Sequence, residues 1–169
     1  NETLMECTPR SIFRSALRAA TLGLSCDPSL GHAYIVPYKN KETGEKEAQF
    51  QPGWHGVQHM ALRTGKYEYI NVSPVYDGES VVEDRITGDL KIEGSPSGSK
   101  NTIGLIASFK LLSGYKKSIY MSNEELEEHG RKYSKMYSRS DSIWKTNKKI
   151  AYHKTILLKL LRTYGYIDP

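Results

Sequence analysis

The sequence predicts an α+β fold in which an antiparallel β-sheet of roughly five strands, with a β-hairpin, is backed by helices. Three observations support this class. A helix-periodic segment comes first, segments rich in aromatic and β-branched residues occupy the middle, and helix-periodic segments return after residue 122. Because strands and helices are grouped in separate parts of the chain, the order favours α+β over alternating βαβ units. A length of 169 residues fits a single domain, 1–169. The chain does not begin with methionine, so we expect flanking segments in the intact protein.

The first predicted helix covers about residues 8 to 22. Thr8 is a suitable N-cap and Pro9 occupies the first helical position. Apolar residues then recur at helical spacing, namely Phe13, Leu17, Ala20 and Leu24, and predict the face toward the core. Arginines at successive four-residue steps, Arg10, Arg14 and Arg18, form a second stripe. This basic stripe is either a solvated face or a contact surface.

The middle of the chain predicts strands. Residues 32–51 read as a β-hairpin around the turn "NKETGEK", with Lys39, Lys41 and Lys46 near its tip. A short helix is predicted from Gly53 to about Gly65. Further strands are predicted in 66–76, 102–112 and 115–122, with a polar, turn-rich excursion that contains 85–94 and a flexible loop at 93–101.

Two helices are predicted at the end of the chain. Ser122 and Asn123 cap a helix over about 123–137 whose acidic first turn suits a helix N-terminus. The last helix is predicted over about 144–164. Its helical projection places Ile150, Leu157 and Leu161 toward the core, and Lys154 also falls on that apolar arc. The opposite face is predicted to carry Lys145, Lys148, Tyr152, Thr155, Lys159 and Arg162.

The charge of the chain is concentrated in these last helices. Between Arg131 and Arg162 there are ten Lys and Arg residues and one acid, Asp141, a net charge of +9, so the rest of the chain carries −4 of the total +5. A basic block of this kind favours a polyanionic partner, most simply nucleic acid.

The two cysteines, Cys7 and Cys26, are too few for a disulfide framework and read as buried free thiols in a reducing cytoplasm. No signal peptide or membrane span is predicted.

The sequence lacks the residue patterns for ATP binding, for nucleophilic catalysis and for a metal site. The loop "GSPSGSKNT" does not match the phosphate-binding pattern G-x-x-x-x-G-K-[ST], so ATP use is unsupported. No nucleophile elbow occurs. The acids Glu79, Glu83, Asp84 and Asp89 are better explained as a solvated surface than as a two-metal nuclease site. His55 and His59 are four residues apart, but Gly56 stands where a zinc protease needs its glutamate, so no metal site is predicted.

Trp54 stands between Gly53 and Gly56, and these glycines indicate that the backbone passes close to another element or to a ligand. The indole is either a core residue or a surface for base stacking. Both alternatives stay open from the sequence.

Two blocks of the sequence resemble the RecT family of phage single-strand annealing proteins. The first contains Ala20 to Leu24, Leu30 to Tyr38 and Gly53 to Gly56, which are similar to the family's A-x-L-G-L, L-G-H-x-Y-[LI]-[IV]-P-[FY] and G-[YW]-x-G motifs. The second contains Trp144 followed by "HKTILLKLLR", similar to the family's W…K-K-T-V-L-[RK]-x-L pattern, with His153 in place of the first lysine. The region "DRITGDLKIEGSPSGSK" has no counterpart in this resemblance.

The resemblance implies a protein that is not an enzyme, uses no ATP or other cofactor, and anneals complementary single strands during DNA recombination. It implies an oligomeric ring or helical filament with DNA in a basic groove. The implied partners are single-stranded DNA, annealed duplex DNA, further copies of the chain, a phage-encoded 5′–3′ exonuclease and the host single-strand-binding protein, all in the cytoplasm of a bacterial host. By motif match, it implies groove roles for Trp54, Trp144, Lys154 and Lys159.

Charge and position add further candidates. The complete set of predicted DNA-binding residues is Trp54, Lys39, Lys41, Lys46, Arg63, Arg131, Lys132, Arg139, Trp144, Lys145, Lys148, Lys149, Tyr152, Lys154, Lys159 and Arg162. The alternatives are a metal-dependent DNA nuclease and a basic protein-interaction module.

Overall fold

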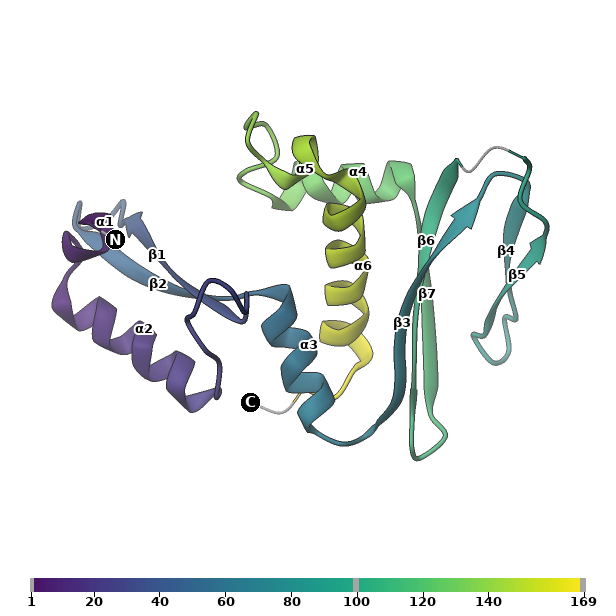
Figure 1. The fold of residues 1–169 in the computed structure, drawn as a ribbon, viewed down its shortest axis with the longest axis horizontal. Coiled ribbons are helices and arrows are strands. Elements are labelled where there is room, and N and C mark those ends of the chain that lie inside the picture. Colours follow the sequence, from purple (N-terminus) through teal and green to yellow (C-terminus); the bar gives the residue numbers. More distant parts are fainter. Residues whose placement is uncertain (1, 99–100, 168–169) are drawn as a thin grey trace. The chain divides into compact units, whose positions relative to one another are not determined.

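A computed structural model describes residues 2–98 and 101–167, and these residues form an α+β fold (Figure 1). The chain divides into two compact units, one that contains the residues up to Thr64 and one that runs from Gly65 to Tyr166. The predicted class is confirmed. The single domain over 1–169 and the oligomer stay predictions.

The first unit consists of helices around a two-stranded hairpin. Its elements are α1 (Glu2–Met5), α2 (Pro9–Thr21), β1 (Ala33–Lys39), β2 (Lys46–Pro52) and α3 (Trp54–Arg63). The predicted N-terminal helix, hairpin and short third helix are therefore confirmed. The strands β1 and β2 pair in antiparallel register, from Ala33 opposite Pro52 to Lys39 opposite Lys46.

Helix α2 contacts the hairpin through small polar residues and not through its apolar stripe. Ser11, Ser15 and Ala19 are its buried residues. The Ser15 hydroxyl donates to the carbonyl of Ala48 at 2.9 Å, and the amide of Ala48 donates to Ser11 Oγ at 2.8 Å. Of the predicted apolar set, Leu24 is buried, whereas Phe13 and Leu17 are exposed because α2 meets the hairpin through Ser11, Ser15 and Ala19. Cys26 is exposed, which corrects its predicted burial, whereas Cys7 is buried.

The two glycines around Trp54 lie against the backbone of the segment before β1. A Cβ atom on Gly53 would lie 2.0 Å from the carbonyl oxygen of Gly31, and one on Gly56 would lie 2.0 Å from that of His32. The predicted close backbone approach is confirmed, and its partner is another element of the same unit. Any side chain at either position would displace α3 from this segment.

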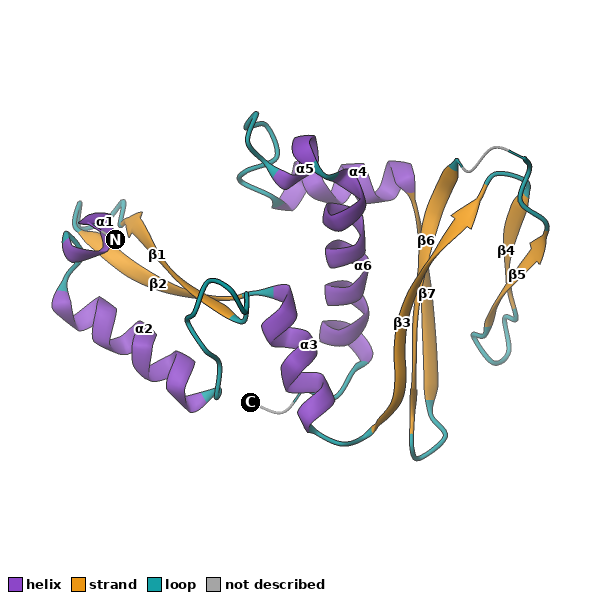
Figure 2. Ribbon diagram, in the orientation of Figure 1, coloured by secondary structure: helices purple, strands orange, loops and turns teal. Residues whose placement is uncertain are grey.

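The second unit contains a three-stranded antiparallel sheet and a separate hairpin (Figure 2). The sheet has the order β3-β6-β7, formed by β3 (Tyr67–Tyr76), β6 (Thr102–Leu111) and β7 (Lys116–Ser122). Among the described residues, β4 (Glu79–Glu83) and β5 (Leu90–Gly94) pair only with each other. The prediction of one sheet of roughly five strands is therefore wrong: β3 pairs directly with β6, so the intervening residues leave the sheet and form their own hairpin. Residues 99 and 100 of the predicted flexible loop lie outside the described residues.

The helices of the second unit are α4 (Asn123–Tyr133), α5 (Ile143–Thr146) and α6 (Lys148–Tyr164). The predicted cap of α4 is confirmed, because Ser122 and Glu125 form a capping box. The predicted single helix over 144–164 is instead two helices. Asn147 interrupts it with φ −151° and ψ 78°, and its side chain accepts from the amide of Ile150 at 3.3 Å, which caps the start of α6.

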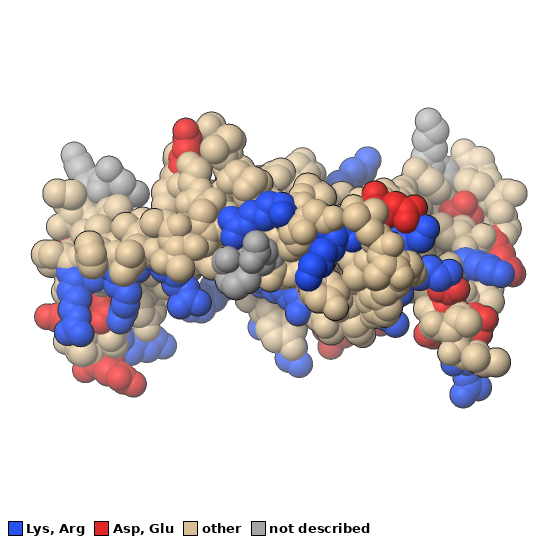
Figure 3. All heavy atoms as spheres, turned by 90° about the horizontal axis from the view of Figure 1, so that it is seen from below, with Lys and Arg blue, Asp and Glu red and all other residues tan. Residues whose placement is uncertain are grey.

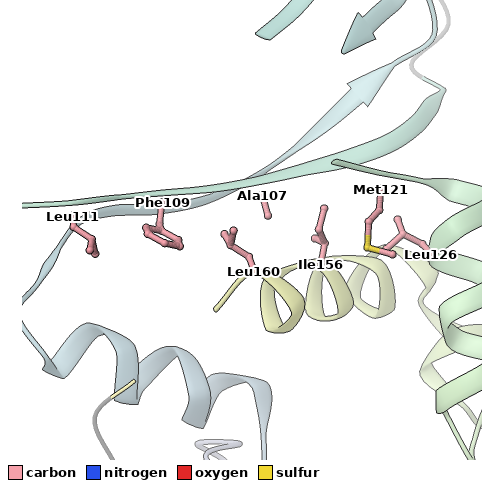
Figure 4. Close-up of a cluster of buried hydrophobic side chains, with 7 residues drawn as sticks. All are labelled: Ala107, Phe109, Leu111, Met121, Leu126, Ile156 and Leu160. Atoms are coloured by element: carbon pink, nitrogen blue, oxygen red, sulfur yellow. The ribbon is translucent and has the colours of Figure 1, made fainter. Parts of the chain in front are cut away.

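The core of the second unit lies between α6 and one face of the sheet (Figure 4). Its buried members are Ala107, Phe109, Leu111, Met121, Leu126, Ile156 and Leu160. On α6, Leu157 and Leu161 are buried as predicted, but Ile150 is 42% exposed and Thr155 is buried. The predicted division of α6 into one basic and one apolar face is wrong, because the helix packs against α4 and α5 as well as the sheet and is therefore buried on several sides.

Candidate nucleic-acid interface

A cavity of about 700 Å³ opens beside the first turns of α6 within the second unit. Its walls are Val72, Pro74 and Tyr76 of β3, Asn101, Thr102 and Leu105 at the start of β6, and Lys149, Tyr152 and His153 of α6. The lining thus combines apolar side chains, three rings, polar groups and one exposed lysine. Aromatic rings beside a cation are the surface that single-stranded nucleic acids need for their bases and phosphates.

Glu127 of α4 organises the wall of this cavity. Its side chain is 14% exposed and accepts hydrogen bonds from Lys148 Nζ at 2.6 Å, from Tyr152 Oη at 2.8 Å and from the Tyr137 hydroxyl. Burial raises the pKa of Glu127, but these hydrogen bonds outweigh burial and lower the pKa to about 2. The carboxylate therefore stays charged and holds α4, α6 and the connecting segment together.

The same contact fixes Tyr152. Burial and the hydrogen bond to Glu127 both raise the pKa of its phenol, so the hydroxyl remains a donor at neutral pH. Sequence reasoning expected Tyr152 to be exposed, which is wrong: the side chain is half-buried and its ring lines the cavity.

Trp144 lies in the interior of the second unit. Its side chain is 5% exposed, and its ring lies 5.5 Å from that of Tyr137 and 6.1 Å from that of Tyr152, measured between centroids. A Cβ atom on Gly130 of α4 would lie 2.6 Å from the indole. The expected stacking surface is therefore not available at Trp144 in this conformation, and the indole instead joins α4 to α5.

Four cations of α6 have no carboxylate partner among the described residues, namely Lys149, Lys154, Lys159 and Arg162. Lys154 is the unusual member because its side chain is half-buried. Burial and the nearby Arg162 lower the pKa of its ammonium. A phosphate at this place would relieve both effects.

Other predicted cations already have partners. Lys148 pairs with Glu127, Arg139 with Asp141 at 2.7 Å, and Lys46 with Glu6. Lys145 and Lys132 lie over the rings of Tyr137 and Tyr133, at 4.9 and 5.3 Å from the centroids. Arg131 is exposed in the last turn of α4. Figure 3 shows Lys and Arg side chains at the surface of one face, with Asp and Glu side chains among them.

The predicted residues of the first unit are described within that unit alone. Arg63 donates to the carbonyl of Leu22 at 2.7 Å and so satisfies the end of α2. Trp54 is half-buried at the first position of α3, and its ring lies 3.6 Å from that of His55. Lys39 and Lys41 are exposed at the hairpin tip.

His55 and His59 of α3 do not point toward a common metal site. His59 stacks on His32 at 4.7 Å between ring centroids, and His55 contacts Trp54. Within residues 2–98 and 101–167, no group of three or more His, Cys, Asp or Glu side chains is arranged to hold a metal ion. In the same residues, no helix has the length and apolar character needed to cross a membrane.

Sequence reasoning missed the strand side of the cavity and missed Glu127. Tyr76, Asn101 and Thr102 come together with α6 only through the pairing of β3 with β6, and no local pattern marks them. Glu127 belongs to a run of acids that was interpreted as a helix N-terminus. Only its burial distinguishes it from its neighbours.

Comparisons with known proteins agree with the resemblance. The model of the RecT family matches residues 1–168. The chain is 37% identical over 167 residues to the uncharacterized protein YqaK of Bacillus subtilis, an alignment that covers 99% of this chain and 55% of that protein. It is 31% identical over 78 residues to protein RecT of Escherichia coli, covering 45% of this chain and 29% of that protein. The chain thus spans about half the length of the B. subtilis protein. Its match to E. coli RecT covers a smaller share of that protein.

Proposed function

Because this chain belongs to the RecT family, we propose that it binds single-stranded DNA and anneals complementary strands during recombination. The observation that supports this most directly is the surface of α6, where cations without carboxylate partners lie on the helix that also lines the ring-bearing cavity. In this proposal the protein makes or breaks no covalent bond.

In this proposal, Lys149, Lys154, Lys159 and Arg162 neutralise backbone phosphates. Each contact releases counterions, which supplies sequence-independent affinity. The cavity holds an unstacked base against Tyr152 and Tyr76, with Lys149 at the phosphate. Stacking on an aromatic ring contributes about 1–3 kcal/mol per base and tolerates any sequence, as annealing requires.

Trp144 and Glu127 have a positioning role in the same proposal. The indole holds α5 against α4, and the carboxylate fixes Tyr152 and Lys148. Neither side chain contacts the strand. Arg131 of the same unit extends the path of the DNA backbone. Lys39 and Lys41 of the first unit are proposed as further phosphate contacts within that unit.

We further propose that annealing needs no ATP, since the sequence lacks the phosphate-binding loop pattern. The proposed assembly is a ring or helical filament that keeps neighbouring strands in register. The proposed partners are a phage 5′–3′ exonuclease and the host single-strand-binding protein, and the proposed location is the cytoplasm of the bacterial host.

The test is an annealing assay with two complementary oligonucleotides, without nucleotide or divalent metal. We expect pairing to be faster than the spontaneous reaction. If each copy makes four phosphate contacts, the logarithm of affinity should fall with the logarithm of salt with a slope near −3, from about −0.7 per contact. Binding that is nearly independent of salt, or no acceleration of pairing, would refute the proposal. Metal-dependent cleavage products would favour the nuclease alternative.

Matched variants locate the interface. Lys149→Ala should weaken binding to an oligonucleotide about 5- to 10-fold, because it removes one phosphate contact at the mouth of the cavity. The control is Lys110→Ala, since Lys110 pairs with Glu68 at 2.7 Å on the sheet of the same unit. Equal effects of the two substitutions would exclude this cavity as the binding site.

A further inference from the structure

The outward face of α2 is apolar and is not used by the first unit. Phe13 is 69% exposed and Leu17, one turn later, is 55% exposed. They lie on the side opposite the buried Ser11, Ser15 and Ala19, since residues at helical spacing share one face. Adjacent large apolar side chains that remain exposed mark a contact surface more often than scattered single ones do.

Arginines border this apolar face. Helix α2 contains Arg10, Arg14 and Arg18 and no acid, so it carries a charge of +3. Arg14 has only a loose contact with Glu47, at 3.9 Å, and its side chain is 72% exposed. The surface therefore suits an apolar side chain surrounded by negative charge.

The hairpin of β4 and β5 carries the complementary features. Ile86 lies at its tip and is 96% exposed. Residues 77–94 contain six acids and two basic residues, a net charge of −4. Residues 84–94 of the hairpin belong to the region that had no counterpart in the family motifs, and the hairpin has no place in the proposed DNA interface.

The tip is held in one conformation. Asp84 Oδ1 accepts from the amides of Ile86 at 2.8 Å and Thr87 at 3.3 Å, and the amide of Gly88 donates to the carbonyl of Asp84 at 2.7 Å. Lys116 pairs with Asp89 at 2.7 Å and fastens the tip to β7. A preorganised apolar residue loses little conformational entropy on binding, so the turn presents Ile86 as an anchor.

We propose that the tip of the β4–β5 hairpin of one copy docks on the outward face of α2 of a second copy. Ile86 lies between Phe13 and Leu17 in this contact, and the acids of the hairpin face Arg10 and Arg14. Because the two surfaces differ, the contact is head to tail and propagates into a ring or an open filament. The inference rests on the proposed assembly and names the surfaces that build it.

The test uses charge reversal on each side. The helix variant is Arg10→Glu with Arg14→Glu, and the hairpin variant is Glu83→Lys with Glu93→Lys. Asp84 and Asp89 are left intact because they hold the tip. Self-association is measured by sedimentation velocity without DNA over a range of protein concentrations. We expect each variant alone to associate at least 10-fold more weakly than the unmodified chain.

An equimolar mixture of the two variants decides between a contact within one chain and a contact between copies. In the mixture, the acidic hairpin of one variant meets the basic α2 of the other, and the basic hairpin meets the acidic α2. Association should therefore return to within about 3-fold of the unmodified chain. The proposal is overturned if the mixture stays dissociated. It is also overturned if the unmodified chain stays monomeric, or if either variant alone associates as strongly as the unmodified chain.

Two further variants complete the design. Ile86→Ser should weaken association without loss of folding, because the side chain is exposed. Glu42→Lys with Glu45→Lys reverses two exposed acids in the other hairpin and should leave association unchanged. An equal loss in this control would overturn the specific contact. Because all readings are made without DNA, a failure of annealing with normal self-association would count against the proposed function alone.

Discussion

Glu127→Gln tests whether the polar cluster beside the cavity stabilises the second unit. Each pKa unit corresponds to about 1.4 kcal/mol, so lowering the pKa of Glu127 from 4.5 to about 2 sets a ceiling of about 3 kcal/mol. Lys148, the charged partner, is 57% exposed, and water screens its contribution. We therefore expect the substitution to lower the free energy of unfolding by about 1–2 kcal/mol at pH 7.

The sign of the pH dependence follows from the lowered pKa. The folded state favours the charged carboxylate, so the stabilisation is complete above about pH 4.5 and is lost as the pH falls toward 2. The unmodified chain and Glu127→Gln should thus differ at pH 7 and converge near pH 2.

The assay is urea unfolding at a series of pH values, followed by circular dichroism. The matched control is Glu128→Gln, which removes an exposed carboxylate from the same helix. A stabilising role of the Glu127 carboxylate is refuted if Glu127→Gln and Glu128→Gln lower stability equally at pH 7. It is also refuted if the difference between Glu127→Gln and the unmodified chain persists undiminished at low pH.

Three other substitutions test the packing and the interface. Gly130→Ala should destabilise the fold by about 1–3 kcal/mol in urea unfolding, because the new Cβ meets the buried indole. The same change in an unobstructed helix would stabilise it, so a gain in stability would contradict the packing. Ser15→Ala should lower the unfolding free energy by about 1 kcal/mol, since it removes a buried hydrogen bond to Ala48, and an unchanged midpoint would exclude that contribution. Lys154→Ala should cost more affinity for single-stranded DNA than Lys116→Ala in a fluorescence anisotropy titration, and equal losses would mean that the half-buried position of Lys154 has no special role.

Local sequence was sufficient for most individual elements. The Thr8-Pro9 start, the turn between β1 and β2, and the Ser122 cap depend on residues a few positions apart, so their signals are visible in the sequence. Gly53 and Gly56 indicated a close backbone approach because glycine alone leaves room for it, but the sequence did not identify the partners, Gly31 and His32. The prediction failed at Asn147, where a good capping residue inside an apparently continuous helical pattern divides α5 from α6.

The faces of the helices were less predictable than their positions. Phe13 and Leu17 read as core residues, but α2 packs through serines because its axis lies close to the edge of β2. Ile150 was expected to be buried and is exposed, whereas Thr155 was expected on the exposed face and is buried, because other elements cover α6 on several sides. Periodicity reports which residues share a face, whereas the neighbouring elements decide which face is buried.

The sequence by itself determined the α+β class, the family, the concentration of positive charge after residue 130, and the lysines of the last helix. These properties follow from composition, short-range spacing and the short motifs that resemble those of the family. Only the tertiary structure decided that Trp144 is internal, that Glu127 holds Tyr152 and Lys148, and that β3 and β6 supply a cavity wall opposite Lys149. The physical reason is that burial and pairing depend on contacts between residues far apart in the chain, and such contacts leave no local pattern.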